Sequence, residues 1–209
     1  MNIVILGAPG SGKGTQSEMI TKKFGLFYLQ AGELAREWGK TNPRIQQIVE
    51  KGELVPEEEM TEYVKQYLEK NVPDTQNILF EGFPRFISQF EEYERWLFAK
   101  GQKIDSIVSL DITQDAAIRR LSSRRVCQKC GQVYNLVTNP PAVSGICKCG
   151  GSLIQRDDDN PESIKIRFEY YHNNTQKLIS YLAGRGRLIR IDADRPIKTV
   201  FKAICDKLV

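Results

Sequence analysis

The chain has 209 residues, which corresponds to one domain with insertions or at most two domains. Its 41% hydrophobic and 27% charged residues exclude a disordered or collagen-like protein. Thirty lysines and arginines against 26 aspartates and glutamates leave a net charge of +4, well short of the clustered basicity of nucleic-acid-binding proteins. Apolar runs stay below the roughly 18 residues of a membrane helix, and no basic leader precedes the first one. We therefore expect a soluble cytoplasmic protein that binds neither membranes nor nucleic acids.

Short apolar runs alternate with helical patterns along most of the chain. The apolar runs predict buried strands at Asn2–Leu6, Asn77–Phe80, Ile104–Leu110 and Arg187–Ile191. The helical patterns predict helices at Thr15–Phe24, Pro43–Lys51, Glu57–Lys70, Ser88–Lys100, Asp115–Arg125, Glu162–Ala183 and Ile197–Leu208. This alternation predicts an α/β fold with a parallel sheet that helices cover on both faces. Two stretches, Ala31–Pro56 and Val126–Asp157, break the alternation, and we interpret each as an insertion at the ligand-binding edge of the sheet.

A glycine-rich loop follows the first predicted strand. The residues from Gly7 to Thr15, GAPGSGKGT, match the pattern G-x-x-x-x-G-K, between a buried strand and a helix. Glycines let successive backbone N–H groups turn inward around an anion, and the following helix adds its positive N-terminal end. Lys13 supplies a cation for the β and γ phosphates. The loop predicts a nucleoside triphosphate site formed by Gly10, Ser11, Gly12, Lys13, Gly14 and Thr15.

The continuation GKGT, in place of GK followed at once by Ser or Thr, is typical of nucleoside monophosphate kinases. Two further segments resemble motifs of that family: AGELAR, which ends at Arg36, and EGFPR from Glu81 to Arg85. The second segment directly follows a buried strand, where ligands of open α/β sheets bind. Over nearly its whole length the sequence resembles the adenylate kinases of the long bacterial form, which carry a zinc-binding lid.

The resemblance implies a P-loop NTPase-type fold with a parallel five-stranded sheet flanked by helices. It also implies a core of residues 1–29, 57–125 and 158–209, a helical NMP-binding insertion at 30–56 and a lid at 126–157. The implied activity is the reversible reaction ATP + AMP = 2 ADP, carried out by a monomer with Mg²⁺ as the companion of ATP.

The resemblance also implies roles for individual residues. The transferring phosphoryl group would be stabilised by Lys13, Arg85, Arg124, Arg156 and Arg167. Besides the glycine-rich loop, ATP would contact Arg120, Arg124, Val133, Tyr134 and Arg195. AMP would contact Ala31, Arg36, Glu53, Leu54, Val55, Gly82, Phe83, Pro84, Arg85, Gln89, Arg156 and Arg167. Glu81 stands where relatives have an aspartate that holds Mg²⁺-bound water, and we expect the longer side chain to serve as an outer-sphere ligand.

Four of the five cysteines lie between Cys127 and Cys149, which indicates metal binding rather than a disulfide framework. Cys127 and Cys130 form a C-x-x-C pair, whereas Cys147 and Cys149 are separated by one residue only. We predict a structural Zn²⁺ held by all four thiolates. The alternatives are a lid that binds the metal through three sulfurs and a lid that has lost it. The remaining Cys205 and the single His172 are expected to be structural.

Three other functions compete with adenylate kinase activity. A UMP/CMP kinase is the closest, because those enzymes carry Ala at the position of Ala31, although Gln89 favours adenine. A nucleic-acid-binding zinc module would need basic and aromatic residues around the cysteines, and the segment offers only Lys129, Lys148 and Tyr134. A catalytically inactive nucleotide sensor is disfavoured by the full set of phosphate-binding arginines.

Overall fold

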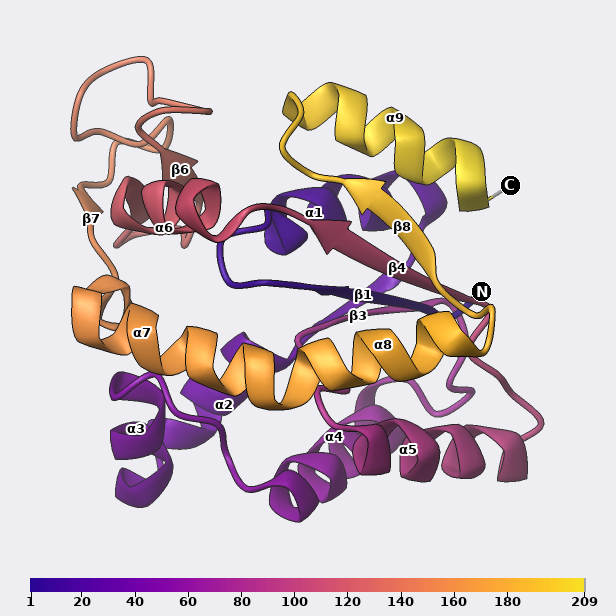
Figure 1. Cartoon of the computed structure of the whole chain (residues 1–209). Coiled ribbons are helices and arrows are strands. Elements are labelled where there is room, and N and C mark those ends of the chain that lie inside the picture. The colour runs from indigo at the N-terminus through magenta and orange to yellow at the C-terminus, as the bar shows by residue number, and fades with distance from the viewer. Residues whose placement is uncertain (209) are drawn as a thin grey trace.

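The structure, a computed structural model, describes residues 1–208. Its centre is a five-stranded parallel sheet in the order β2-β3-β1-β4-β8 (Figure 1). The strands are β1 (Ile3–Gly7), β2 (Phe27–Gln30), β3 (Ile78–Glu81), β4 (Ser106–Asp111) and β8 (Ile189–Asp192). Neighbouring strands pair in parallel, with Ile3 opposite Leu79 on one side and Ser106 on the other. The predicted α/β class and the five-stranded parallel sheet are confirmed.

Alternate residues of the strands enter two separate cores, because successive side chains of a strand point to opposite faces. Val4 and Leu6 of β1 belong to the core that is covered by α4 (Glu57–Asn71), α5 (Ile87–Ala99) and α8 (Gln176–Gly184). Ile3 and Ile5 belong to the core on the other face, under α1 (Lys13–Phe24) and α9 (Ile197–Leu208). The sheet is therefore buried on both sides, as unbroken apolar strands require.

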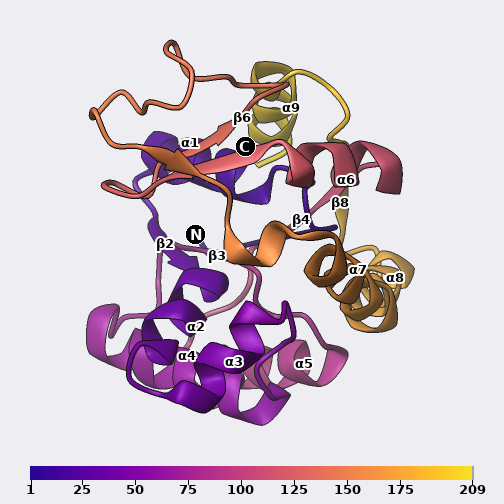
Figure 2. The ribbon, with the colours of Figure 1, turned by 90° about the vertical axis from the view of Figure 1, so that its left-hand side faces the viewer.

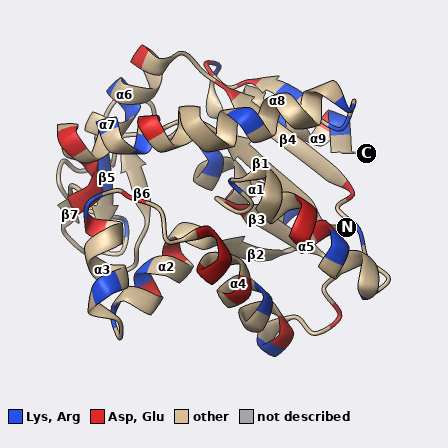
Figure 3. Ribbon diagram, turned by 60° about the horizontal axis from the view of Figure 1, so that its bottom comes forward, with Lys and Arg blue, Asp and Glu red and all other residues tan. Residues whose placement is uncertain are grey.

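The remaining helices lie nearer the carboxyl ends of the strands. They are α2 (Ala31–Gly39), α3 (Pro43–Glu50), α6 (Gln114–Ser122) and α7 (Pro161–Tyr170). Charged residues follow the helix dipoles on the outer surface: α4 begins with three glutamates and carries Lys70 in its last turn (Figure 3). Among residues 1–208, no helix combines the length and apolar composition needed to cross a bilayer.

A second, antiparallel sheet lies outside the core. It has the order β6-β5-β7, formed by β5 (Arg124–Cys127), β6 (Val133–Asn135) and β7 (Leu153–Ile154). Figure 2 shows this small sheet and the α2–α3 pair at opposite ends of the same side of the molecule. The two stretches that break the βα alternation in the sequence thus flank one side of the core.

Besides α2 and the small antiparallel sheet, which the sequence did not predict, three elements differ from the sequence predictions. The strand Phe27–Gln30 was not predicted, because it is short and only partly buried, with Tyr28 and Gln30 among four residues. The predicted helix Asp115–Arg125 ends at Ser122, so Arg124 and Arg125 belong to β5 instead. The single helix predicted from Glu162 to Ala183 is interrupted by a π-helical segment, Tyr171–Thr175, between α7 and α8.

Candidate functional site

A cleft of about 1210 Å³ opens at the carboxyl end of the central sheet. Its walls include the segments that directly follow β1, β2, β3 and β8, together with residues of α6, β6 and α7. Ligands of open parallel sheets bind at this edge, because the loops that leave neighbouring strands converge there. The cleft separates the α2–α3 pair from the small antiparallel sheet.

The cleft is lined by nearly every residue that the sequence nominated for nucleotide or magnesium binding. Those predicted to contact ATP are Gly10, Ser11, Gly12, Lys13, Gly14, Thr15, Arg120, Arg124, Val133, Tyr134 and Arg195. Those predicted to contact AMP or Mg²⁺ are Ala31, Arg36, Glu53, Leu54, Val55, Glu81, Gly82, Phe83, Arg85, Gln89, Arg156 and Arg167. Pro84 lies instead on an adjoining cavity of about 100 Å³, which it shares with Lys13, Arg85 and Arg167.

The glycine-rich loop has the backbone of an anion cradle. Gly10 and Gly12 adopt φ angles of 80° and 90°, which disfavour any residue with a Cβ. A Cβ on Gly10 would also lie 2.5 Å from the carbonyl oxygen of Ala117, so the loop can pack against α6 only with glycine there. The first turn of α1 contains no acidic residue, and the buried hydroxyl of Ser11 has no hydrogen-bond partner among the described residues. A glycine-rich turn that leads into a helix N-terminus without acidic residues has the chemistry to bind an anion such as phosphate.

Lys13 holds its ammonium group over this loop. Its Nζ donates to the carbonyl oxygens of Gly7 and Ala8, both at 2.8 Å. Burial is the main cause that lowers the pKa of Lys13 to about 8; Glu81 opposes the shift, and the guanidinium of Arg85 contributes to it. An anion bound in the cleft would restore the stability of the charged form.

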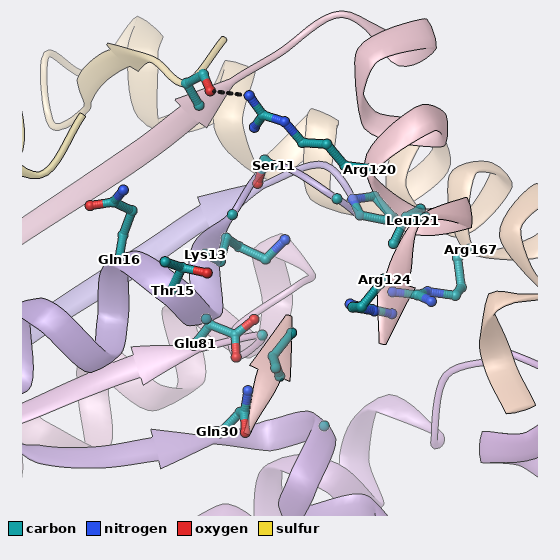
Figure 4. A pocket seen from close by; sticks show the side chains of 18 of the residues that line it. Ser11, Lys13, Thr15, Gln16, Gln30, Glu81, Arg120, Leu121, Arg124 and Arg167 are labelled. Atoms are coloured by element: carbon teal, nitrogen blue, oxygen red, sulfur yellow. Dashed lines mark hydrogen bonds between the residues drawn. The ribbon is translucent and has the colours of Figure 1, made fainter. Parts of the chain in front are cut away.

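Three arginines are held by two consecutive carboxylates at the centre of the cleft. Arg124 Nε donates to Asp159 Oδ2 at 2.7 Å, and Arg167 donates to Asp159 Oδ1 at 3.1 Å. Arg156 makes a bidentate pair with Asp158, at 2.9 and 3.0 Å. The three arginines come from β5, α7 and the turn before α7, and the fold brings Arg124 to Asp159 across 35 residues of sequence. Figure 4 shows Arg124 and Arg167 next to each other in the cleft.

The arginines of this cluster repel one another, and the neighbouring carboxylates do not fully neutralise their charge. Burial lowers the pKa of Arg156 to about 10, and the positive charges of Arg124 and Arg36 add to the effect. Burial likewise lowers the pKa of Arg85 to about 10, with Arg167 and Arg36 adding to it and Glu81 opposing it. A cluster of buried cations that destabilise one another favours a polyanionic ligand, whose charge would satisfy all of them.

The α2 side of the cleft contains the residues predicted to read a base. Gln89 is 2% exposed; its Oε1 accepts from the backbone N–H of Arg85 at 2.9 Å, and its Nε2 donates to the carbonyl oxygen of Glu57 at 3.1 Å. An amide can accept two hydrogen bonds and donate two, so one of each remains available. Arg85 Nε donates to the carbonyl oxygen of Gly82 at 2.8 Å, which turns its guanidinium toward the cleft.

Glu81 ends strand β3 beside the glycine-rich loop, with its carboxylate near Lys13 (Figure 4). The hydroxyl of Tyr28 donates to Glu81 Oε2 at 3.2 Å and fixes the carboxylate. Oxygen ligands of this kind suit Mg²⁺, which keeps several of its waters and tolerates outer-sphere carboxylates. The position thus fits the predicted role, although Glu replaces the usual Asp.

The far end of the triphosphate side is formed by α6 and the loop after β8. Arg120 donates to the carbonyl oxygen of Ala193 at 3.0 Å, and Figure 4 shows its guanidinium reaching toward that loop. Arg195 pairs with Asp192 at 2.9 Å on the surface of the same loop. Tyr134 contributes to the cleft wall, but its hydroxyl contacts Cys147 Sγ at 3.4 Å.

The four cysteines of the small sheet form one cluster. Their sulfur atoms all lie within 4.8 Å of one another, and contacts of 3.5, 3.6 and 3.3 Å join Cys127 to Cys149, Cys130 to Cys147 and Cys149 to Cys130. Four thiolates at Zn–S bonds of ~2.3 Å in a tetrahedron would lie ~3.8 Å apart, close to these values. A Cβ on Gly151 would lie 2.6 Å from Cys127 Sγ, so glycine is required beside the cluster. Cys149, the second residue of the C-x-C pair, therefore contributes its sulfur to the cluster. Four sulfur atoms at these distances fit a tetrahedral zinc ion.

The sequence analysis did not predict the two carboxylates that hold the arginines. The run of three aspartates from Asp157 to Asp159, between Arg156 and Arg167, was a signal for such ion pairs. Asp159 is 1% exposed, so its charge is compensated only by the arginines it contacts. Cys205 is a buried residue of α9, as predicted. His172 lies outside the cleft walls, bonded to Gln176 at 2.6 Å.

Comparison with known proteins places these features in one family. The sequence profile described as "Adenylate kinase" matches residues 5–187. The chain is 38% identical over 213 residues to an adenylate kinase of Bacillus licheniformis, covering 100% of this chain and 98% of the relative. It is 39% identical over 214 residues to an adenylate kinase of Caldicellulosiruptor saccharolyticus, with 100% and 99% covered. An archaeal adenylate kinase, from Archaeoglobus fulgidus, is 36% identical over 210 residues, with 98% and 96% covered.

Proposed function

The chain belongs to the adenylate kinase family, whose members are nucleoside monophosphate kinases, and from this premise we propose a specific reaction and specific residue roles. The reaction is ATP + AMP = 2 ADP, in either direction. The observation that carries the proposal is the convergence of Lys13 with five arginines (Arg36, Arg85, Arg124, Arg156 and Arg167) on one cleft. Two nucleotides that meet through their phosphates supply the negative charge this cluster lacks.

Positioning and charge neutralisation account for the chemistry we propose. The transferred phosphoryl group passes through a loose transition state whose charge is spread over its equatorial oxygens. Lys13 and the glycine-rich loop would hold the β and γ phosphates, and Arg124, Arg156 and Arg167 would surround the group in transit. The acceptor phosphate is already an anion, so no general base is needed. Mg²⁺, when bound near Glu81, supplies further neutralisation of the triphosphate.

The arginines would exchange partners when nucleotides bind. In this structure, Asp158 and Asp159 hold the three guanidiniums in place at the rim of the space that the phosphates would fill. Planar guanidiniums have five donors, so each can keep a carboxylate contact while other N–H groups turn to a phosphate oxygen. We infer that the carboxylates orient the arginines before the substrates arrive, which reduces the cost of reorganisation.

Adenine is the acceptor base that we propose. Gln89 retains one acceptor and one donor after its contacts with Arg85 and Glu57, and these match the N6 amino group and the N1 atom of adenine. Ala31, 4% exposed at the start of α2, is the feature that favours the alternative, a UMP/CMP kinase. A base that leaves the Gln89 amide unpaired loses more in kcat/KM than a change of one small side chain at position 31 can contribute. We therefore expect Gln89 to determine the preference for AMP over UMP and CMP.

We further propose the division of the chain that the sequence predicted. Residues 30–56 would bind the NMP, residues 126–157 would form a lid stapled by zinc, and the rest would form the core. The cysteine cluster supports the zinc, since a segment with so little buried apolar surface gains its folding energy from metal binding. We also propose that the protein acts in the cytoplasm as a monomer.

A coupled assay of ADP formation with AMP, UMP, CMP or GMP as acceptor tests the function. We expect turnover with AMP to exceed that with each of the other three. Equal use of UMP or CMP would favour the UMP/CMP kinase. Tight ATP binding without turnover on any acceptor would show a nucleotide sensor, and ATP hydrolysis stimulated by nucleic acid would show a nucleic-acid-dependent ATPase.

A further inference from the structure

The side chain of Tyr134 joins the nucleotide cleft to the cysteine cluster. Tyr134 is the central residue of β6, opposite Arg125 on β5, and one residue after Val133 in the cleft wall. It is 5% exposed and packs with Cys127 and Cys147 in a small apolar cluster of the lid. Its ring thus reaches from the cleft wall to the sulfur atoms.

The phenolic hydroxyl bridges two consecutive residues of the tight C-x-C turn. The backbone N–H of Lys148 donates to the Tyr134 oxygen at 3.1 Å, and the same oxygen lies 3.4 Å from Cys147 Sγ. A backbone N–H can only donate, so the phenolic oxygen is the acceptor in the first contact. Its own O–H is therefore available for the second contact, and a thiolate sulfur can accept it.

We propose that Tyr134 is an outer-sphere residue of the zinc centre, donating a hydrogen bond to the Cys147 thiolate. This inference rests on the proposed zinc site in the lid. Four thiolates around Zn²⁺ carry a net charge of about −2, and donors to the sulfur atoms offset part of it. The other half-site has such a donor from the backbone, the N–H of Lys129, which donates to Cys127 Sγ at 3.4 Å.

The two contacts of the Tyr134 hydroxyl also fix the position of β6, which forms part of the cleft wall. Because the hydroxyl is committed to Cys147 and Lys148, Tyr134 holds β6 against the metal centre. The neighbouring Val133 and Asn135 line the cleft, and Asn135 pairs with Arg124 across the β5–β6 ladder. Tyr134 is thus a positioning residue: it sets where this strand lies relative to the sulfur atoms.

The variant Tyr134→Phe tests the proposal, because it removes the hydroxyl and keeps the ring that packs in the cluster. Zinc affinity, measured by competition with a chromogenic chelator, should fall roughly 10–100-fold, the usual effect of losing an outer-shell partner. In the Co²⁺-substituted protein, the sulfur-to-metal charge-transfer band should move to lower energy, because an unbonded thiolate gives up electron density more readily. The matched control is Tyr181→Phe, whose hydroxyl bonds to Glu91, far along the chain from the cysteines.

Site-specific replacement of Tyr134 by a fluorotyrosine gives a second measurement if the phenylalanine variant fails to fold. The more acidic hydroxyl donates more strongly, so the band should move in the opposite direction. A Tyr134→Phe protein with wild-type metal affinity and an unchanged band would overturn the inference while leaving the zinc site intact. A wild-type chain that takes up neither Zn²⁺ nor Co²⁺ would overturn both.

Discussion

Arg124 and Asp159 form a buried ion pair that ties the small antiparallel sheet to the core, with Nε 2.7 Å from Oδ2. Arg124 begins β5, whereas Asp159 ends the short 3-10 turn before α7, and the Asp159 side chain is fully buried. The same carboxylate accepts from Arg167 on α7 at 3.1 Å. One aspartate therefore orients two of the arginines that we propose to surround the transferring phosphoryl group.

Replacing Asp159 by Asn should weaken both stability and catalysis. The substitution leaves two guanidiniums without their shared counter-charge, and breaking a buried pair typically costs about 3–5 kcal/mol. We expect the lower end of that range, because 18% of each arginine side chain stays exposed. Thermal unfolding and steady-state turnover measure the two effects. Asp157→Asn is the control, an exposed neighbour in the same turn, and an equal loss in both variants would contradict the role of Asp159.

Lys13→Met should abolish most activity while the fold persists. The variant removes the cation from the phosphate site, and loss of one well-placed transition-state charge costs roughly 10²–10³ in turnover. Circular dichroism checks that the fold is kept, and Lys13→Arg, which retains the charge, should lose less. Near-normal turnover of Lys13→Met would mean that the glycine-rich loop does not hold the transferred phosphate.

Nucleotide-free protein should gain stability from Lys13 as the pH rises from about 8 toward 10.5. The pKa of Lys13 is lowered from 10.5 to about 8 in the folded state, so in this window the unfolded chain binds more protons. Stability rises with pH wherever the unfolded state holds more protons. Denaturant unfolding at several pH values should therefore show a rising contribution in wild type that is missing in Lys13→Met. Parallel pH profiles for the two proteins would contradict the lowered pKa.

Purified protein should contain about one zinc per chain, and Cys130→Ser should lower its thermal stability more than its affinity for AMP. The metal would stabilise the small sheet, whereas none of the residues proposed to contact AMP belongs to that sheet or to the cysteine cluster. Elemental analysis, a melting curve and AMP titration provide the three readouts. Cys205→Ser is the matched control, since that thiol is buried on α9 and does not belong to the four-cysteine cluster. Freshly prepared protein without zinc would rule out the site.

Ala31→Thr should widen the preference for AMP over UMP and CMP. Ala31 begins α2 and lies close to Gly82, whose Cβ, if present, would be 3.7 Å from the Cβ of Ala31. A change of this size is worth about 1–3 kcal/mol of discrimination. Competition between AMP and UMP gives the ratio of kcat/KM values directly. If Ala31→Thr instead narrowed the preference for AMP, Ala31 would not be the residue that weakens discrimination against UMP and CMP.

Local sequence patterns were sufficient for the features that depend on contiguous residues. The glycine-rich loop needs glycines at fixed positions between a strand and a helix, and all of these constraints lie within Ile3–Phe24. The cysteine pairs likewise predicted a four-sulfur cluster, because each pair is held by one short turn. The parallel sheet followed from apolar runs that alternate with helical patterns, since only burial on both faces explains such strands.

Only the tertiary structure decided how distant residues meet. Arg124 reaches Asp159, 35 residues further along the chain, only because the fold brings β5 to the turn before α7, whereas Arg156 pairs with Asp158 two residues away. Strand β2 exists because β3 pairs with it, although its own residues are only partly apolar. Tyr134, predicted to contact ATP, lies in the cleft wall, and only the fold directs its hydroxyl to Cys147. The reason is common to all three: each depends on free energy gained across elements, from ion pairing, strand pairing and burial, which a local pattern does not contain.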